Sequence, residues 1–374
     1  MKKIIGKYIV LILDCIFSII LKNKSKKTNG IILIRTDGIG DFILWLYSAE
    51  KIRENINEKI TLICNNSCFE LAQNMKYFDE VISIDYNKMK FNLKYKYLFF
   101  KKIKKNNYKM LINPIYSRNI ISEGLVKNIS AKEKIGINSN DTNLSSNLIK
   151  ICNNFYSKLI KINFNNEMEL YRNLDFTNKL LKKKYELKFP KIELKKCERI
   201  LEEEYCVFFL GASNVNRCLE IEKFINMGEM ISENLKIVLC GGKSEETLGK
   251  KFIEKIINKK QILNLIGKTT LLETINLIKN SKFIIGNETF SAHLAPLFKV
   301  KSICILGGGH FGRFMPYPKE LEDLDDPFLP QVIYKTMDCF NCNWYCKYKE
   351  VPWKCIKNIE VEKINEIIKS KLIK

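Results

Sequence analysis

Short, fully apolar runs separated by helix-like stretches dominate the chain from residue 30 onward. The runs are continuously hydrophobic and do not alternate with polar residues, which is typical of parallel strands covered on both faces. They predict strands at residues 31–34, 60–64, 81–84, 110–112, 205–210, 236–240, 283–285 and 302–306. Helical periodicity between them, as over residues 42–53, predicts crossover helices and therefore an α/β fold.

The strands fall into two groups, and the 374 residues suit two domains of roughly 150 residues each. We predict a Rossmann-like domain over residues 28–195 and a second over 196–335. An N-terminal segment (1–27) precedes them, and a Cys-rich segment with a final helix near 361–373 (336–374) comes after them. Residues 138–190, polar and rich in Asn, are harder to interpret.

Each strand of the second half runs into glycine at its carboxyl end. The glycines are Gly211, Gly241-Gly242, Gly286 and Gly307-Gly308-Gly309. In open α/β sheets ligands bind at these ends, because glycine lets the backbone approach the ligand and the next helix offers free N–H groups. The pattern predicts two lobes with a cleft between them.

The N-terminal segment is apolar over residues 4–21 apart from Lys7 and Asp14. These charges make it a poor membrane span, and no small-residue cleavage site of a signal peptide comes after it. On a helical wheel the polar side chains form one stripe: Lys3, Lys7, Asp14, Ser18, Lys22 and Ser25. A helix in a membrane interface, with its lysines near anionic headgroups, is the favoured interpretation. Packing on the protein's own surface and a true span are the alternatives.

Lysine and arginine number 63 against 41 acidic residues, a net charge of +22. Such an excess favours an anionic partner: nucleic acid, an acidic membrane surface or a phosphorylated substrate. We attribute part of it to a composition rich in Ile, Asn and Lys. The lysines are spread along the chain without a zinc-finger or RNP-type sequence, which argues against nucleic acid. The 13 scattered cysteines favour reduced thiols in the cytoplasm.

One candidate for chemistry is the turn from Arg35 to Asp41, which contains Gly38 and Gly40. The turn places Asp41 near the start of the next helix. There its carboxylate either caps free N–H groups or acts as a general base for a hydroxyl nucleophile. No Gly-Lys-Ser/Thr comes after it, so the turn is not a P-loop.

A second candidate is the stretch from Gly286 to Leu294. Thr289 and Ser291 are N-cap types, and the helix that they begin would direct its positive end at a diphosphate, with His293 one turn in. An ordinary capped helix with a packed histidine is the alternative. The turn from Gly307 to His310 would supply a second wall of backbone amides.

These motifs resemble those of glycosyltransferase family 9, the bacterial heptosyltransferases, in family order from residue 30 to about 318. The apolar strand with Arg-x-Asp-Gly-Ile-Gly-Asp is similar to the family's opening motif. Glu288-Thr289-Phe290-Ser291-Ala292-His293-Leu294 resembles its Asp-Thr-Gly-x-x-His-Leu motif. Arg217, in Arg-x-Leu-x-x-Glu-x-Phe, falls at a basic phosphate contact, and Glu245 comes after the Gly-rich turn whose acid meets the nucleoside.

The resemblance implies a GT-B fold with an N-terminal acceptor lobe and a C-terminal donor lobe. It makes Asp41 the base, with Arg35, Gly38 and Gly40 on the acceptor side. The implied donor-binding residues are Arg217, Glu245, Glu288, Thr289, Ser291, His293, Gly307 and Gly308. Two positions depart from the family pattern: Glu288 replaces Asp, and Phe290 replaces Gly.

Two further groups of residues could carry chemistry. Asp323-Leu324-Asp325 matches the Asp-x-Asp of metal-dependent glycosyltransferases, although its acidic, proline-flanked surroundings favour a solvated loop. Four cysteines near the C-terminus have a spacing that would allow zinc or an iron–sulfur cluster. They are Cys339, Cys342, Cys346 and Cys355. Reduced structural thiols and a disulfide are the alternatives.

Taken with the resemblance, the sequence predicts an inverting, metal-independent glycosyltransferase that requires no cofactor. The expected donor is a nucleotide-diphosphate sugar, ADP-heptose first, and the expected acceptor is a lipopolysaccharide core or another lipid-linked cell-surface glycan. We expect it on the inner face of the cytoplasmic membrane, peripherally bound to the anionic surface. A catalytically silent GT-B protein that binds a glycolipid or a partner is the alternative.

Overall fold

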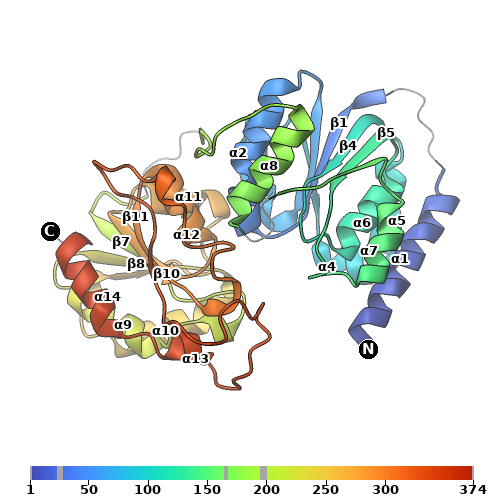
Figure 1. Ribbon diagram of the computed structural model, residues 1–374. Helices are drawn as coiled ribbons and strands as arrows, with labels where there is room; N and C mark the ends of the chain where they lie inside the picture. The colour runs from blue at the N-terminus through green and yellow to red at the C-terminus, as the bar shows by residue number, and fades with distance from the viewer. Residues whose placement is uncertain (1, 23–27, 164–166, 194–199, 373–374) are drawn as a thin grey trace. The chain divides into compact units, whose positions relative to one another are not determined.

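The computed structural model describes residues 2–22, 28–163, 167–193 and 200–372. It divides into two compact units. The first comprises Met1–Asn165 and Leu170–Leu187, and the second Asn166–Glu169 and Lys188–Lys374. Each unit contains a six-stranded sheet with helices on both faces, so the predicted α/β architecture with two parallel sheets is confirmed (Figure 1).

The first unit has strand order β3-β2-β1-β4-β5-β6, and every pairing is parallel. The strands are β1 (Thr28–Arg35), β2 (Ile60–Asn65), β3 (Glu80–Ile84), β4 (Asn107–Asn113), β5 (Ala131–Ile137) and β6 (Lys158–Ile160). The helices are α1 (Lys2–Ile20), α2 (Ile39–Asn55), α3 (Phe69–Asn74), α4 (Tyr86–Phe91), α5 (Leu93–Ile103), α6 (Ile120–Asn128), α7 (Ser146–Asn153) and α8 (Glu169–Leu181).

The second unit repeats this order as β9-β8-β7-β10-β11-β12. Its strands are β7 (Tyr205–Phe209), β8 (Lys236–Cys240), β9 (Ile262–Asn264), β10 (Phe283–Asn287), β11 (Lys301–Ile305) and β12 (Gln331–Ile333). Its helices are α9 (Ile221–Ile231), α10 (Glu246–Lys255), α11 (Leu271–Lys279), α12 (Phe290–Leu294), α13 (Lys354–Lys357) and α14 (Val361–Ile367). In each sheet the first three strands are added to one side and the next three to the other, so a topological switch point lies between β1 and β4 and between β7 and β10. Ligands of open α/β sheets bind at such a switch point.

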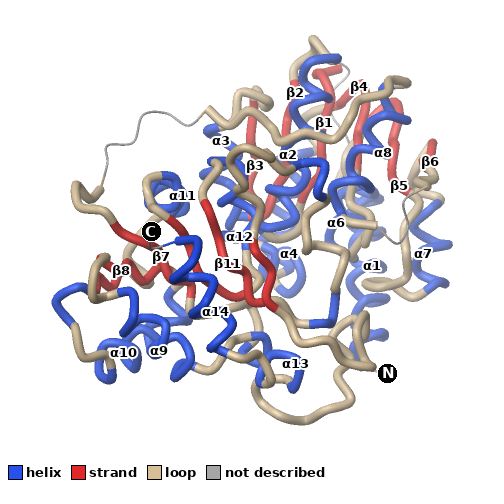
Figure 2. Tube along the Cα trace, turned by 60° about the vertical axis from the view of Figure 1, so that its left-hand side comes forward, coloured by secondary structure: helices blue, strands red, loops and turns tan. Residues whose placement is uncertain are grey.

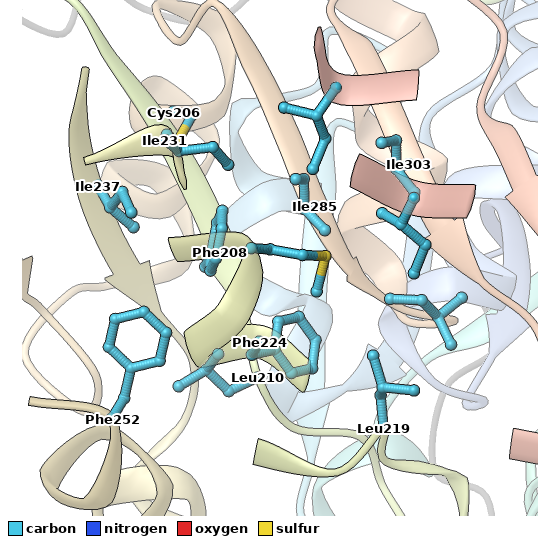
Figure 3. Packing of buried hydrophobic residues seen from close by; sticks show 14 of the residues in the cluster. Cys206, Phe208, Leu210, Leu219, Phe224, Ile231, Ile237, Phe252, Ile285 and Ile303 are labelled. Atoms are coloured by element: carbon cyan, nitrogen blue, oxygen red, sulfur yellow. The ribbon is translucent and has the colours of Figure 1, made fainter. Parts of the chain in front are cut away.

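Apolar side chains fill the space between each sheet and its helices. In the second unit Phe208 and Ile285 of the sheet pack against Phe224 of α9 and Phe252 of α10 (Figure 3). The tube view separates the strands from the helices that cover them (Figure 2). These interiors explain why continuous apolar runs predicted the strands correctly: residues of both faces are buried.

Helix α1 packs on the first unit through both apolar and polar side chains: Val10 and Leu11 are buried in the core together with Asp14. Its polar stripe faces the protein: Asp14 forms an ion pair with Lys96 of α5 at 2.7 Å, and Lys7 Nζ donates to the Asn143 carbonyl at 2.6 Å. The Lys7 amine thus has a carbonyl partner on the protein, and contact of the helix's lysines with headgroups stays a prediction. Ser25 of the predicted stripe lies outside the described residues.

The structure adds elements that the sequence did not indicate. Strands β5, β6, β9 and β12 have no continuous apolar run, and three of them are only three residues long. The final helix, predicted to residue 373, ends at Ile367 and continues as a π-helical turn to Leu372. Among the described helices, none is long and apolar enough to cross a membrane.

Candidate active site

In the first unit, the turn after β1 is held from inside by Arg35. Its side chain is fully buried and pairs with the Asp37 carboxylate at 3.0 Å. Its second guanidinium nitrogen donates to the backbone carbonyl of Asp41 at 2.9 Å. Arg35 therefore holds Asp37 and the Asp41 backbone in place from the interior of the unit.

Asp41 stands in the first turn of α2, two residues after the helix begins at Ile39. Gly38 is the N-cap residue, with extended φ of −75°. A Cβ at Gly38 would lie 3.7 Å from Asp41 Oδ2. The sequence prediction that Asp41 lies at the start of this helix is confirmed, and its role as a base stays a prediction.

A hollow of about 360 Å³ opens beside this turn. Its lining is mostly polar: Lys7, Thr36, Asp37, Gly38, Asn65, Tyr86, Lys90, Asn119, Ile120 and Asn143. Gly38 lines this hollow, and Asp41 itself is not among the lining residues. Hydroxyl, amide and amine groups of this kind suit a hydroxylated acceptor, and the two lysines suit an acceptor that carries negative charge.

In the second unit, Asn287 ties together the carboxyl ends of β7 and β10. Its buried side chain donates to the Leu210 carbonyl at 2.9 Å and accepts from the backbone N–H of Leu219 at 2.8 Å. This clamp fixes the loop that carries Arg217 against the strand that leads to Glu288. Sequence reasoning missed Asn287 because a buried clamp has no distinctive local pattern.

Arg217 and Glu288 form the charged centre of this unit's site. The guanidinium donates to the Glu288 carboxylate at 2.8 Å, and the ring of Trp344 lies 4.5 Å from the guanidinium carbon. Burial raises the pKa of Glu288, while the charge and hydrogen bond of Arg217 oppose that shift. Arg217 Nε is buried and makes no hydrogen bond within the described part of the chain. A donor with this orphaned N–H suits an incoming oxyanion.

Glu245 lies between the ends of β7 and β8. A Cβ at Gly211 would come within 2.2 Å of Glu245 Cγ, and one at Gly241 within 2.6 Å of its Oε2. Glycine is therefore needed at both strand ends to admit this side chain. The structure brings Glu245 to the substrate end of the sheet, where its contact with a nucleoside stays a prediction.

The helix after β10 is short, and the Thr289 side chain at its N-cap position makes no capping hydrogen bond. Helix α12 has five residues, and the Thr289 and Ser291 hydroxyls lie 2.8 Å apart, sharing a hydrogen bond. His293 is buried beneath them, with Nδ1 3.1 Å from the Tyr317 hydroxyl. Burial lowers the pKa of His293 to about 3, so the ring is neutral near pH 7. This placement matches the packed-histidine alternative.

The turn after β11 is covered by aromatic side chains of the C-terminal segment. A Cβ at Gly308 would collide with the Phe340 ring at 2.2 Å, and one at Gly309 with Trp344 at 2.3 Å. The backbone N–H groups of Asn341 and Asn343 donate to the carbonyls of these two glycines. The triple glycine is explained by this cover, and contact of Gly307 and Gly308 with a donor stays a prediction.

Trp344 links the cover to the charged centre. Its indole N–H donates to His310 Nδ1 at 3.0 Å, and its ring stacks on Trp353 with centroids 5.2 Å apart. The backbone N–H of Trp353 donates to the backbone carbonyl of Asn216, the residue before Arg217. Sequence reasoning missed the contacts of Trp344 with Arg217 and His310. The run of three glycines was the one local signal that a large side chain approaches closely.

The four C-terminal cysteines line one small cavity beside Gly308 and Gly309. All four are free thiols, so the disulfide alternative does not describe them. Burial is the main cause that raises the pKa of Cys355, and the other three thiols raise it further. Within the described ranges, however, no three His, Cys, Asp or Glu side chains are arranged to hold a metal ion.

The Asp-x-Asp stretch forms an exposed turn, in line with the solvated-loop interpretation. Asp323 pairs with Lys299 at 2.8 Å and accepts the backbone N–H groups of Asp325 and Asp326. A cavity of about 550 Å³ lies nearby, but residues such as Lys301 and Gln331 place it at the amino ends of β11 and β12. Ligands of open α/β sheets bind at the other end.

Comparison with known proteins agrees with this geometry. The model of glycosyltransferase family 9 (heptosyltransferase) matches residues 97–327, more than half of the chain. The turn from Arg35 to Asp41 lies outside the matched residues. No curated protein matches the chain's sequence significantly.

Solved structures share the fold over most of the chain. The family 9 glycosyltransferase of Veillonella parvula has a TM-score of 0.70 and 16% identity, covering 92% of this chain and 97% of that one. Escherichia coli ADP-heptose LPS heptosyltransferase II gives 0.65 and 13%, covering 92% and 98%. The iron-containing E. coli heptosyltransferase TibC in complex with ADP-D-β-D-heptose gives 0.52 and 12%, covering 93% and 76%.

Proposed function

Because the chain belongs to glycosyltransferase family 9, the heptosyltransferase family, we propose that it transfers a heptose or related sugar from ADP-heptose. The acceptor in this proposal is a hydroxyl of a lipopolysaccharide core or another lipid-linked cell-surface glycan. Two of the similar structures name ADP-heptose in their descriptions, and this supports the choice of donor. The proposal also assigns the reaction to the inner face of the cytoplasmic membrane.

The observation that carries the proposal is the Arg217 guanidinium at the switch point of the second sheet. It is oriented by Glu288 and Trp344, and its Nε has an unused hydrogen at a buried position. Fixed positive charge of this kind stabilises a diphosphate as it departs. Glu288 is thus a positioning residue, and its change from the family's Asp lengthens the arm that reaches Arg217.

The chemistry proposed is a single displacement at the anomeric carbon. The Asp41 carboxylate takes the proton of the acceptor hydroxyl, whose oxygen attacks the anomeric carbon as the bond to the diphosphate breaks. The electron pair of that bond leaves with the nucleoside diphosphate, and Arg217 stabilises the charge. Configuration is inverted because attack and departure are on opposite faces. The proposal requires both units to act on one sugar.

We test this function with calorimetric titrations of the purified full chain against ADP-, GDP-, UDP- and dTDP-sugars. ADP-heptose should bind most tightly, and nuclear magnetic resonance of the product should show the inverted anomer. Equal binding of all four nucleotides would overturn the choice of donor. Binding without transfer to any lipid-linked acceptor would identify the catalytically silent alternative.

Metal independence is part of the proposal, since Arg217 supplies the positive charge that a divalent ion supplies elsewhere. Transfer should therefore survive EDTA, and strict dependence on Mn²⁺ would contradict this. Iron or zinc on the four C-terminal thiols is a separate matter. Thiolates are the donor type that both metals prefer, but their described arrangement does not fit an ion, and no step is assigned to one. Metal analysis of the purified protein decides this point.

A further inference from the structure

Helix α1 presents a stripe of isoleucines to the outside of the first unit. The exposed members are Ile5, Ile9, Ile12, Ile16, Ile19 and Ile20, each between 42% and 75% accessible. Their spacing of three and four residues places them along a single face of the helix. Exposed apolar side chains gathered in this way mark a contact surface, whereas scattered ones do not.

The rotation of α1 is fixed by the opposite face. Asp14 and Lys96 are both buried and paired, and Asn128 Nδ2 donates to the Asp14 carbonyl at 3.0 Å. A Cβ at Gly124 of α6 would lie 2.3 Å from Asp14 Oδ2, so glycine there makes room for the carboxylate. Rolling the helix to bury its isoleucines would expel this ion pair. The isoleucine stripe is therefore held outward by the fold itself.

The neighbouring helices α4 and α5 also carry exposed apolar side chains, together with lysines. Phe17 of α1 packs on Phe100 of α5 with ring centroids 6.1 Å apart, so the two helices are adjacent (Figure 1). Three large apolar side chains of α4 and α5 are exposed: Phe91, Leu93 and Leu98. Residues 86–105 contain eight lysines and no Asp or Glu; Lys96 and Lys104 are buried, and the other six are at least partly exposed. The one acidic residue of α1, Asp14, is buried.

We propose that the isoleucine face of α1, flanked by the lysines of α4 and α5, docks on the surface of an anionic lipid bilayer. Isoleucine side chains enter the boundary between headgroups and acyl chains, and the amines contact lipid phosphates. Helices α1 and α5 carry no exposed carboxylate, so the isoleucine face is bordered by amines without opposing charge, which matches the uniform negative charge of an anionic bilayer.

The same helix also borders the candidate acceptor hollow. Lys7 of α1 and Asn143, which are hydrogen-bonded to each other, both line that hollow with Asp37. A bilayer on the outer face of α1 would thus lie beside the place where a lipid-linked acceptor enters. This last step rests on the proposed function, but the docking itself does not.

The test is sedimentation of the full chain with phosphatidylcholine vesicles, with and without phosphatidylglycerol. We expect binding to the vesicles that contain phosphatidylglycerol and weaker binding at high salt. The double variant Ile12→Asp/Ile19→Asp should bind at least about tenfold more weakly. A matched control, Ile257→Asp/Leu324→Asp, changes two apolar residues of the second unit that are even more exposed, and this variant should bind as the wild type does.

Three outcomes would overturn the docking proposal. One is no binding of the wild type to either vesicle, and another is equal binding of the wild type and the α1 variant. The third is a wild-type dimer that the α1 variant converts to a monomer without any vesicle binding, which would assign the stripe to a second copy of the chain. Calorimetry with ADP-heptose separates the proposals, because the α1 variant should bind the donor normally whichever outcome occurs.

Discussion

In the first unit the carboxyl end of the sheet opens onto a hollow lined mostly by polar residues, most of which come from the turn after β1, the end of β2, helix α4, the start of α6 and Lys7 of α1. In the second unit, with the same strand order, residues of a segment more than 30 positions further along the chain cover the glycine turn after β11. The hollow of the first unit is open and mostly polar, whereas the turn of the second unit is partly covered by aromatic side chains.

The contrast shows how one strand order supports two kinds of site. An open polar hollow can accept varied hydroxylated molecules, whereas aromatic rings fixed around an arginine restrict what reaches it. Because the sheets are alike, the difference in function lies in the loops and covering segments at the strand ends. Variants in each unit can therefore break one side of the comparison while leaving the other intact.

The largest effect is expected from Asp41→Asn in the first unit. Loss of a general base typically lowers the rate by about 10²–10⁴-fold, and nucleotide binding should be unchanged because that site belongs to the second unit. Transfer kinetics and calorimetry measure the two effects. Asp37→Asn is the matched control, since that carboxylate pairs with Arg35 and lines the hollow of the first unit. A larger loss in the control would make Asp37 the base.

The second unit should lose stability in acid through His293. Its pKa is lowered to about 3 by burial, so the unfolded chain binds a proton that the folded protein does not as the pH falls below the ordinary value of 6.5. Relative to His293→Gln, the wild type should lose about 2 kcal/mol of unfolding free energy between pH 6.5 and 4.5. Urea unfolding at both pH values measures this difference. If the difference in unfolding free energy between wild type and His293→Gln did not change with pH, the His293 ring would be accessible to protons in the folded protein.

The first unit should show the opposite slope through Asp14, whose pKa is raised to about 6 mainly by burial, with Lys96 opposing the shift. A raised acid pKa gives stability that is fully present below pH 3.8 and is lost as the pH rises through 6. Relative to Asp14→Asn, wild type should lose up to about 3 kcal/mol between pH 4 and 7 in urea unfolding. If the unfolding free energies of wild type and Asp14→Asn depended on pH in the same way, Asp14 would not distinguish the two units.

A smaller effect is expected from Arg217→Ala in calorimetric titrations with ADP. Loss of a charge-assisted contact costs about 1.5–3 kcal/mol, or roughly 10–150-fold in affinity. Arg217→Lys keeps the charge and should recover part of the loss, since its single amine cannot hold Glu288 and a phosphate in the same fork. Unchanged affinity in the alanine variant would remove Arg217 from the donor site.

The smallest effect is expected from Trp344→Leu, which removes the ring that covers Arg217. A cation–π contact of this kind contributes about 1 kcal/mol, so ADP should bind roughly fivefold more weakly. The matched control is Tyr345→Leu, since Tyr345 is the next residue and is 84% exposed. If both variants bind ADP as the wild type does, the aromatic cover has no part in the donor site.

The fold could be predicted wherever burial covers both faces of a strand, because such strands are apolar throughout, as in residues 236–240. Strand β5 escaped prediction because its first half carries three charged residues: Lys132 and Glu133 are exposed, and the Lys134 amine donates to the Val126 carbonyl. The three-residue edge strands are too short to leave any pattern. Local sequence therefore predicts the centre of each sheet and misses its margins.

Positions of the site residues were predictable because glycine and polar residues come directly after the strands. Side-chain directions were not. His293 occupies a motif position suited to a ligand, yet it points into the interior, and no neighbouring residue in the sequence signals this. The Trp344 contact joins residues more than 100 positions apart along the chain, so it has no local signature either.

The buried ion pair between Lys96 and Asp14 determines how the chain tolerates truncation at its N-terminus. Removing α1 to obtain a tidier protein would also remove the only carboxylate paired with this amine in the described contacts and uncover the surface of α6 around Gly124. Breaking a buried ion pair from one side destabilises a protein by about 3–5 kcal/mol. The first helix is thus a structural member of its unit, and truncated versions should be expected to express poorly.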